Sequence, residues 1–271
     1  QYSDLRSSRK PRRRASRLNG SSQHGGLREP RADLALQYAR RSVEPLDYTG
    51  IGQGSAITRL VLSVSRLKLI SLNSDYCAVY NYYLYLNQTD PDGTLSWLIS
   101  ELLSSEQKGE KVHIISHIPS GDNYCLKGWA HNFYEIVNRF ENTIAAQFYG
   151  HTHYDHFQLY SDDSNPAGRP THINFISPSL TTESYTNPAY RIYTIDGGYE
   201  GASYTVIDTE TYATNLDDAN TKDQEPEWFL EYSAKDTFGL PDLSPSSWIN
   251  LVERLAVDDD LFKKFHRDLK K

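Results

Sequence analysis

The chain has 271 residues, a hydrophobic fraction of 38% and a net charge of −7. This length and apolar content allow one large α/β domain, or a domain with a small appendage. Because nucleic-acid phosphates are bound by clustered Lys and Arg, the net negative charge excludes nucleic acid as the expected partner. No apolar run reaches the 18 residues of a transmembrane helix.

The charge is unevenly distributed along the chain. Residues 1–45 contain eleven Lys and Arg against four acids, a net charge of +7, so the remainder carries −14. We expect residues 1–65 to be a basic, disordered or unrelated segment, because residues 1–55 are rich in Arg, Ser, Gly and Gln and show little periodicity. The beginning of the chain shows no hydrophobic stretch typical of a signal peptide, and the absence of Met predicts a piece of a longer protein.

Strand and helix patterns alternate through the middle of the chain. Short apolar runs predict strands at 67–72, 112–115 and 145–149. Apolar residues with helical spacing separate these runs. They are Leu95, Leu98, Ile99, Leu102 and Leu103 before a stop at Gly109, and then Phe133, Ile136, Val137 and Phe140. This alternation predicts an α/β sheet.

The later part of the chain changes character. Segments 156–160, 172–176, 190–195 and 203–207 are rich in β-branched and aromatic residues, which predicts antiparallel strands. From Glu225 onward the pattern predicts helices, with apolar stripes through 248–255 and 261–269.

Histidines follow two of the predicted strands. His117 ends the second strand, and the turn Gly150-His151-Thr152-His153 follows the third. Ligands at the carboxyl ends of neighbouring parallel strands converge on one crevice, and imidazole is a common zinc ligand. On an extended segment His151 and His153 would share a face and serve two adjacent ions. The alternative is a pair of solvated surface histidines, but the position at the strand ends favours a metal site.

The other candidates are weaker. Asp155 is a possible acceptor that would orient a ligand imidazole. We predict that His113 is structural. His131 and His156 are either near the site or solvated, and we favour the solvated state for both. Two-metal hydrolysis also needs a bridging carboxylate and a proton donor. The stretch before Cys77 contains no Asp-x-His, Gly-Asp-x-x-Asp or Gly-Asn-His, so no catalytic residue is assigned and the ligand set is expected to be incomplete.

Two further features concern the compartment. Cys77 and Cys125 are either two buried thiols or a disulfide, and Asn87-Gln88-Thr89 is a glycosylation sequon. Together they favour a secretory context.

The block from about Leu67 to Phe265 resembles the acid sphingomyelinase family of zinc-dependent phosphodiesterases, within the calcineurin-like metallophosphoesterase superfamily. The segments that carry this resemblance are Leu69-Ile70-Ser71-Leu72-Asn73, Asn87-Gln88-Thr89-Asp90-Pro91, Lys111-Val112-His113-Ile114-Ile115, Glu141-Asn142-Thr143, the run from Ala145 to His153, Asn187-Pro188-Ala189-Tyr190-Arg191, and Phe238-Gly239-Leu240-Pro241.

The resemblance implies an α/β fold. Residues 66–212 would be the C-terminal half of a metallophosphoesterase sandwich, with mixed sheets and flanking helices, and residues 213–271 a small helical C-terminal subdomain. It also implies two Zn²⁺ ions, a disulfide and a glycan. The residues concerned are His117 and His151 on one zinc, His153 on the other, Cys77 paired with Cys125, and Asn87 glycosylated.

The activity implied is hydrolysis of the phospholipid sphingomyelin at a membrane surface, by a secreted or lysosomal protein. The family's bridging Asp and general-acid His have no counterpart here, so we expect this chain alone to be weakly active or inactive. Glu183 stands near the place where sphingomyelinases carry a substrate-side Tyr. The alternatives are a related phosphodiesterase acting on nucleotides and a non-catalytic truncated isoform that binds anionic lipid.

Overall fold

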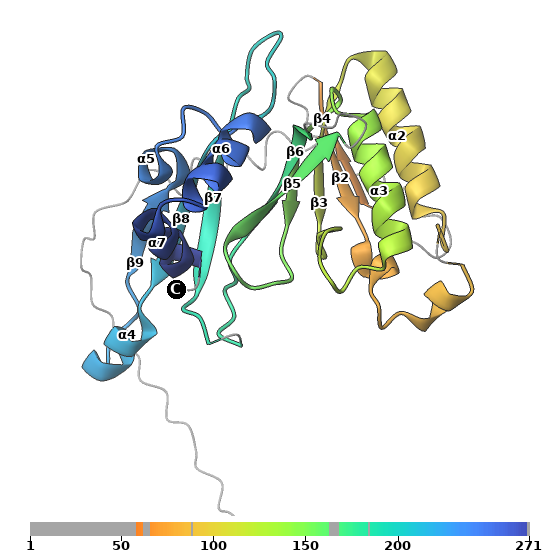
Figure 1. Ribbon diagram of the computed structural model, residues 1–271. Helices are drawn as coiled ribbons and strands as arrows, with labels where there is room; N and C mark the ends of the chain where they lie inside the picture. The colour runs from red at the N-terminus through yellow and green to blue at the C-terminus, as the bar shows by residue number, and fades with distance from the viewer. Residues whose placement is uncertain (1–57, 62–65, 88, 163–167, 184, 270–271) are drawn as a thin grey trace, which may run out of the picture. The chain divides into compact units, whose positions relative to one another are not determined.

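The computed structural model describes residues 58–61, 66–87, 89–162, 168–183 and 185–269, which all belong to one compact unit, 41–271. Most of the predicted basic segment, residues 1–57 and 62–65, lies outside the described residues. Within the described part the strands form two sheets, ordered β1-β2-β3-β4-β6-β5 and β7-β8-β9 (Figure 1).

Four parallel strands form the middle of the first sheet. They are β2 (Leu67–Leu72), β3 (Lys111–Ser116), β4 (Ile144–Tyr149) and β6 (Arg169–Ile176). The antiparallel strands β1 (Thr58–Val61) and β5 (His156–Asp162) flank them. The predicted strands of this sheet are confirmed, but β6, which was predicted to be antiparallel, is parallel to β4 and antiparallel only to β5. Because β3 and β4 are parallel neighbours, the loops that follow them emerge at the same edge.

Helices α2 (Thr94–Lys108) and α3 (Lys127–Arg139) cover one face of this sheet (Figure 1). The α2 helix begins after Gly93, and the Asp90 carboxylate accepts the Leu95 N–H there at 2.9 Å. It ends at Gly109, whose φ of 66° lies in the left-handed region that favours glycine. The predicted apolar face of α3 lies in a core shared with β2, β3 and β4, and so do Leu95, Leu98 and Leu102 of α2. Ile99 and Leu103, which were predicted to share that face of α2, are exposed.

The second sheet packs on the opposite face of the first (Figure 1). Its antiparallel strands are β7 (Ala189–Ile195), β8 (Val206–Thr214) and β9 (Trp228–Ser233). The associated helices are α4 (Leu216–Lys222), α5 (Ala234–Phe238), α6 (Pro245–Leu255) and α7 (Asp259–Leu269). Phe175 of β6 packs with Tyr232 and Trp248 in the core between the two layers. The α/β class, with mixed sheets and flanking helices, is therefore confirmed.

Two predicted elements of the later part differ from the structure. The segment from Glu225 was predicted to be helical, but Trp228–Ser233 is strand β9. Its pairing with β8 buries Tyr232, and this tertiary contact overrides the local pattern. The strand predicted at 203–207 instead begins at Val206 and continues to Thr214, because Ser203 and Thr205 bond to the Asp196 turn. The expected boundary at 213 stays a prediction.

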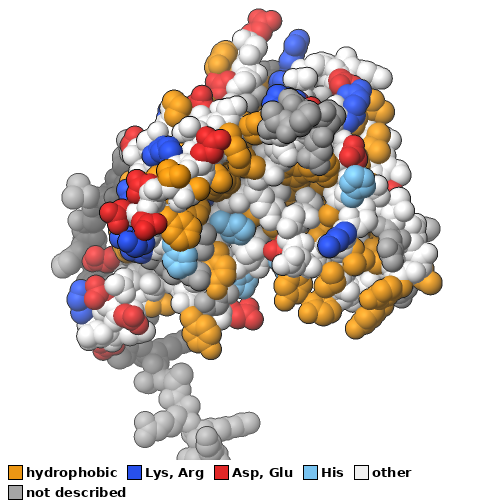
Figure 2. All heavy atoms as spheres, viewed as in Figure 1, with side chains coloured by type: hydrophobic (Ala, Val, Ile, Leu, Met, Phe, Trp, Pro, Cys, Tyr) orange, Lys and Arg blue, Asp and Glu red, His pale blue; other side chains and the backbone are white. Residues whose placement is uncertain are grey.

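A loop after β2 carries the short helices η2 (Ser74–Cys77) and η3 (Tyr82–Tyr85). The disulfide that the resemblance implies is present, and it joins Cys77 to Cys125. Apolar side chains gather at the lower right of the view, over the place of this loop (Figure 2). None of the described helices is long and apolar enough to cross a membrane.

Candidate metal centre

His117 and His151 meet at the common edge of β3 and β4. His117 Nε2 lies 3.2 Å from His151 Nδ1, and the two rings are nearly perpendicular with centroids 5.0 Å apart. The two turns are also tied through the backbone, since the Gly150 N–H donates to the His117 carbonyl at 3.1 Å. The convergence predicted from the parallel strand ends is thus observed for these two imidazoles.

Hydrogen bonds to the end of β2 fix the turn that carries His117. The Ser116 hydroxyl donates to the Leu72 carbonyl at 2.7 Å, and the Ile118 N–H donates to Ser74 Oγ at 2.6 Å. These bonds hold His117 between two anchored neighbours and leave its own side chain exposed.

The turn that carries His151 and His153 is not extended, so the prediction that their side chains share a strand face is wrong. The backbone φ is 74° at His151 and 64° at His153, both in the left-handed region that side-chain-bearing residues rarely adopt. Such conformations persist where surrounding contacts impose them, and they occur often at functional sites.

The histidine pair fits part of a zinc coordination shell. Two ligands about 2.0–2.1 Å from a tetrahedral Zn²⁺ lie about 3.3 Å apart, close to the 3.2 Å between His117 and His151. In the part of the chain that the structure describes, no three His, Cys, Asp or Glu side chains gather to hold a metal ion. The pair would therefore supply two positions of one ion. The assignment of His153 to a second ion stays a prediction.

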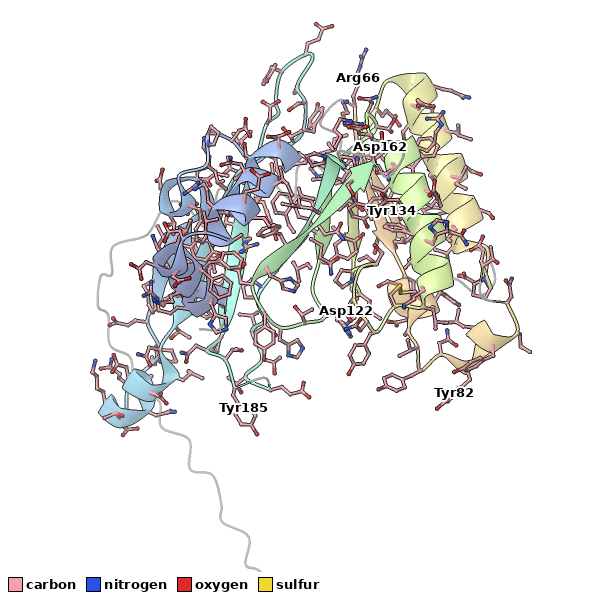
Figure 3. The ribbon with its side chains drawn as sticks, in the orientation of Figure 1. Arg66, Tyr82, Asp122, Tyr134, Asp162 and Tyr185 are labelled. Carbon is pink, nitrogen blue, oxygen red and sulfur yellow. A yellow bond between two sulfur atoms is a disulfide. The ribbon has the colours of Figure 1, made fainter. Side chains whose placement is uncertain are left out.

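Carboxylates and an aromatic ring border the pair. Burial lowers the pKa of His151, against the opposing influence of Asp122, and this favours the neutral imidazole that binds metal. Asp122 lies on the loop between β3 and α3, near the edge where both turns emerge (Figure 3). The Tyr124 ring lies 5.0 Å from the His151 ring.

Asp155 belongs to a buried cluster that joins the two sheets. Its carboxylate pairs with Arg191, and it accepts the hydroxyls of Thr211 at 2.8 Å and Tyr232 at 2.7 Å. The cluster anchors the chain two residues after His153 to strands β7, β8 and β9. Orientation of a ligand imidazole by Asp155 stays a prediction.

His156 differs from its predicted solvated state. It is half-buried at the start of β5, and its Nε2 lies 2.9 Å from the Thr152 hydroxyl within the histidine turn. Burial lowers its pKa. Its position as the first strand residue after the turn was the available signal. His113 is buried and its Nε2 bonds the Tyr204 carbonyl at 2.7 Å, as expected for a structural residue, and His131 is exposed.

The glycosylation sequon lies on the surface. Asn87 is exposed, and its Nδ2 donates to the Asp90 carbonyl at 3.2 Å. Attachment of a glycan there stays a prediction.

Comparison with known proteins identifies a set of related sequences. Residues 170–269 match the family described as the acid sphingomyelin phosphodiesterase C-terminal region. The chain is 60% identical to sphingomyelin phosphodiesterase 2 of Caenorhabditis elegans, over 74% of this chain and 32% of that protein. It is 50% identical to sphingomyelin phosphodiesterase of Homo sapiens, over 73% of this chain and 31% of that protein.

A more distant relative is named for a different activity. The chain is 34% identical to a cyclic GMP-AMP phosphodiesterase of Rattus norvegicus, over 79% of this chain and 49% of that protein.

The chain spans about a third of the length of the two sphingomyelin phosphodiesterases described above.

Proposed function

We propose that this chain, which belongs to the acid sphingomyelin phosphodiesterase family over about three quarters of its length, carries part of a zinc-dependent phosphodiesterase site. The observation that carries the proposal is the 3.2 Å approach of His117 Nε2 to His151 Nδ1. The substrate proposed is sphingomyelin at a membrane surface, cleaved to ceramide and phosphocholine. The identity of 60% to one sphingomyelin phosphodiesterase supports this choice.

The chemistry divides between the metal and the chain. A bound Zn²⁺ supplies Lewis acidity at the phosphodiester and lowers the pKa of water. His117 and His151 would hold it, and the backbone bond between Gly150 and His117 keeps their two turns in register. The Asp155 cluster anchors the far side of the turn. The described residues do not gather a third ligand, so we propose weak or no turnover by this chain alone.

Zinc content per chain tests the proposal. The purified chain should bind one Zn²⁺ in equilibrium dialysis, and His117→Ala and His151→Ala should each abolish binding. His131→Ala is the matched control, because this histidine is exposed on α3. Zinc binding that persists in both variants would contradict the assignment of His117 and His151 as zinc ligands.

A substrate assay separates the two phosphodiester classes. The chain, and a longer protein that contains it, should be given sphingomyelin and a cyclic dinucleotide side by side with zinc. Sphingomyelin turnover only by the longer protein is expected. Turnover of the nucleotide alone would favour a nucleotide phosphodiesterase, as the name of the rat relative suggests. Rapid turnover of sphingomyelin by the 271 residues would contradict the expected weak activity.

We also propose a secreted or lysosomal location, supported by the Cys77–Cys125 disulfide.

A further inference from the structure

A group of exposed aromatic and aliphatic side chains borders the candidate metal centre. We call it the aromatic rim, and it consists of Tyr80, Tyr82, Tyr85, Leu86 and Tyr124, which are 68%, 74%, 68%, 85% and 45% exposed. Apolar groups gather at this end of the fold (Figure 2), and Tyr82 points outward from η3 (Figure 3). Contiguous apolar surface of this kind marks an interaction site more often than a plain solvated face.

The rim is continuous with the histidine pair. The Tyr124 ring lies 5.0 Å from His151 and 5.7 Å from Tyr80, measured between ring centroids. The Val79 N–H donates to the Tyr124 carbonyl at 2.8 Å, and the neighbouring disulfide joins the two loops. The loops that carry the rim are therefore fastened together beside His151. A surface that contacts Tyr80 and Tyr124 would therefore lie beside His151.

The charges around the aromatic rim indicate which lipid headgroups it would contact. The Asp122 carboxylate accepts the Tyr124 N–H at 2.8 Å, so a negative charge lies beside the rim, and Asp75 lies on η2 in the loop that also carries Tyr80. Lys127, at the start of α3, is the cation on the same loop. The local balance is negative, and it disfavours anionic headgroups. Tyrosine rings attract quaternary ammonium groups and prefer the interfacial layer of a bilayer.

We propose that the aromatic rim docks the chain on a zwitterionic phosphocholine bilayer. Tyr82, Tyr85 and Leu86 would enter the interfacial layer, and the Tyr80–Tyr124 pair would face the choline groups. The inference rests on the proposed function in taking a lipid surface as the place of reaction. The contacts that define the rim involve no metal, so the two can be tested apart.

Vesicle flotation in EDTA tests this docking without hydrolysis. The full chain is mixed with phosphatidylcholine vesicles at 0.5 M salt, where screening suppresses binding by the basic segment 1–45. The triple variant Tyr82→Ser/Tyr85→Ser/Leu86→Ser should bind at least about tenfold more weakly than wild type. The variant Tyr82→Phe/Tyr85→Phe should retain binding, which distinguishes loss of the apolar surface from misfolding.

A second triple variant provides the matched control. Tyr199→Ser/Val257→Ser/Phe262→Ser removes side chains that are 58%, 87% and 51% exposed and lie off the rim, and it should bind as wild type does. Equal loss in both triple variants, or no loss in the rim variant, would overturn the proposal. Binding only to anionic vesicles at low salt would assign it to the basic segment, and sedimentation without vesicles would assign the rim to self-association. Failure of zinc binding leaves this test intact.

Discussion

Arg191 and Asp155 form an ion pair that is buried on both sides, with side-chain exposures of 5% and 4%. The Tyr232 hydroxyl bonds both partners, at 2.8 Å to Arg191 Nη2 and at 2.7 Å to Asp155 Oδ2. Burial raises the pKa of Tyr232, so this hydroxyl stays a donor. The three groups come from the histidine turn, β7 and β9, and together they connect the two sheets beside the candidate site.

Substitution of Asp155 should be strongly destabilising. Asp155→Asn leaves the Arg191 charge buried without its partner, which costs about 3–5 kcal/mol of unfolding free energy. Urea denaturation measures this loss. Asp218→Asn is the matched control, because it breaks an exposed pair with Lys222 and should cost less than about 1 kcal/mol. The double variant Asp155→Leu/Arg191→Met removes both charges and should recover much of the stability. A double variant as unstable as Asp155→Asn would contradict this account.

Removal of a second buried charge, that of Lys68, should destabilise the fold less than substitution of Asp155. Lys68 has a side chain 2% exposed, and it pairs with Glu101 at 3.1 Å and Glu110 at 3.5 Å. These carboxylates keep 20% and 23% exposure, so water can hydrate them when the lysine charge is removed. Lys68→Met should therefore cost about 1 kcal/mol or less, whereas Lys68→Ala also loses the packed stem and should cost about 2–3 kcal/mol. Equal losses in urea denaturation would show that the charge dominates.

The part of the fold predicted best is the part set by local periodicity. The apolar runs of β2, β3 and β4 and the helical faces of α2 and α3 repeat at the spacing that each element needs. The parallel order of β3 and β4 then follows from the intervening helix, and with it the meeting of His117 and His151. This contact required no knowledge of distant residues.

The features that were missed depend on partners far along the chain. The β9 strand pairs with β8 and brings Tyr232 to Asp155, 77 residues away, and the short pattern of 228–233 carries no sign of these contacts. Likewise, the residue types at His151 and His153 do not indicate the left-handed backbone that the structure shows there. For His156, burial depends on the fold of the preceding turn, so composition alone suggested a solvated histidine.

Stability should fall in acid because of His172. Burial lowers the pKa of this histidine from 6.5 to about 4, so it is neutral in the folded state. The unfolded chain takes up its proton first as the pH falls below 6.5, so stability is present above that pH and is lost on the way to pH 4. The expected loss from this group is about 3 kcal/mol.

Comparison with variants isolates the contribution of His172. His172→Gln removes the titrating group, so its unfolding free energy should fall less steeply than that of wild type between pH 7 and pH 4, by about 3 kcal/mol in total. His131→Gln alters an exposed histidine and should follow the wild-type profile. Parallel profiles for wild type and His172→Gln would rule out this origin of acid sensitivity.

The Cys77–Cys125 disulfide should contribute to stability through the unfolded chain. It closes a loop with a sequence separation of 48 residues. In the chain-entropy description, closing a loop of this length contributes about 4 kcal/mol. The variant Cys77→Ser/Cys125→Ser should lose about this amount of unfolding free energy in thermal or urea unfolding. A reductant present during unfolding should destabilise the wild type and leave the variant unchanged. The loop closed by Cys77 and Cys125 also carries the aromatic rim, including Tyr124 beside His151. The variant should therefore also bind phosphatidylcholine vesicles more weakly. Unchanged unfolding of the variant would mean that η2 and the start of α3 are held together by their packing and by the backbone bonds of Val79 and Leu126 alone.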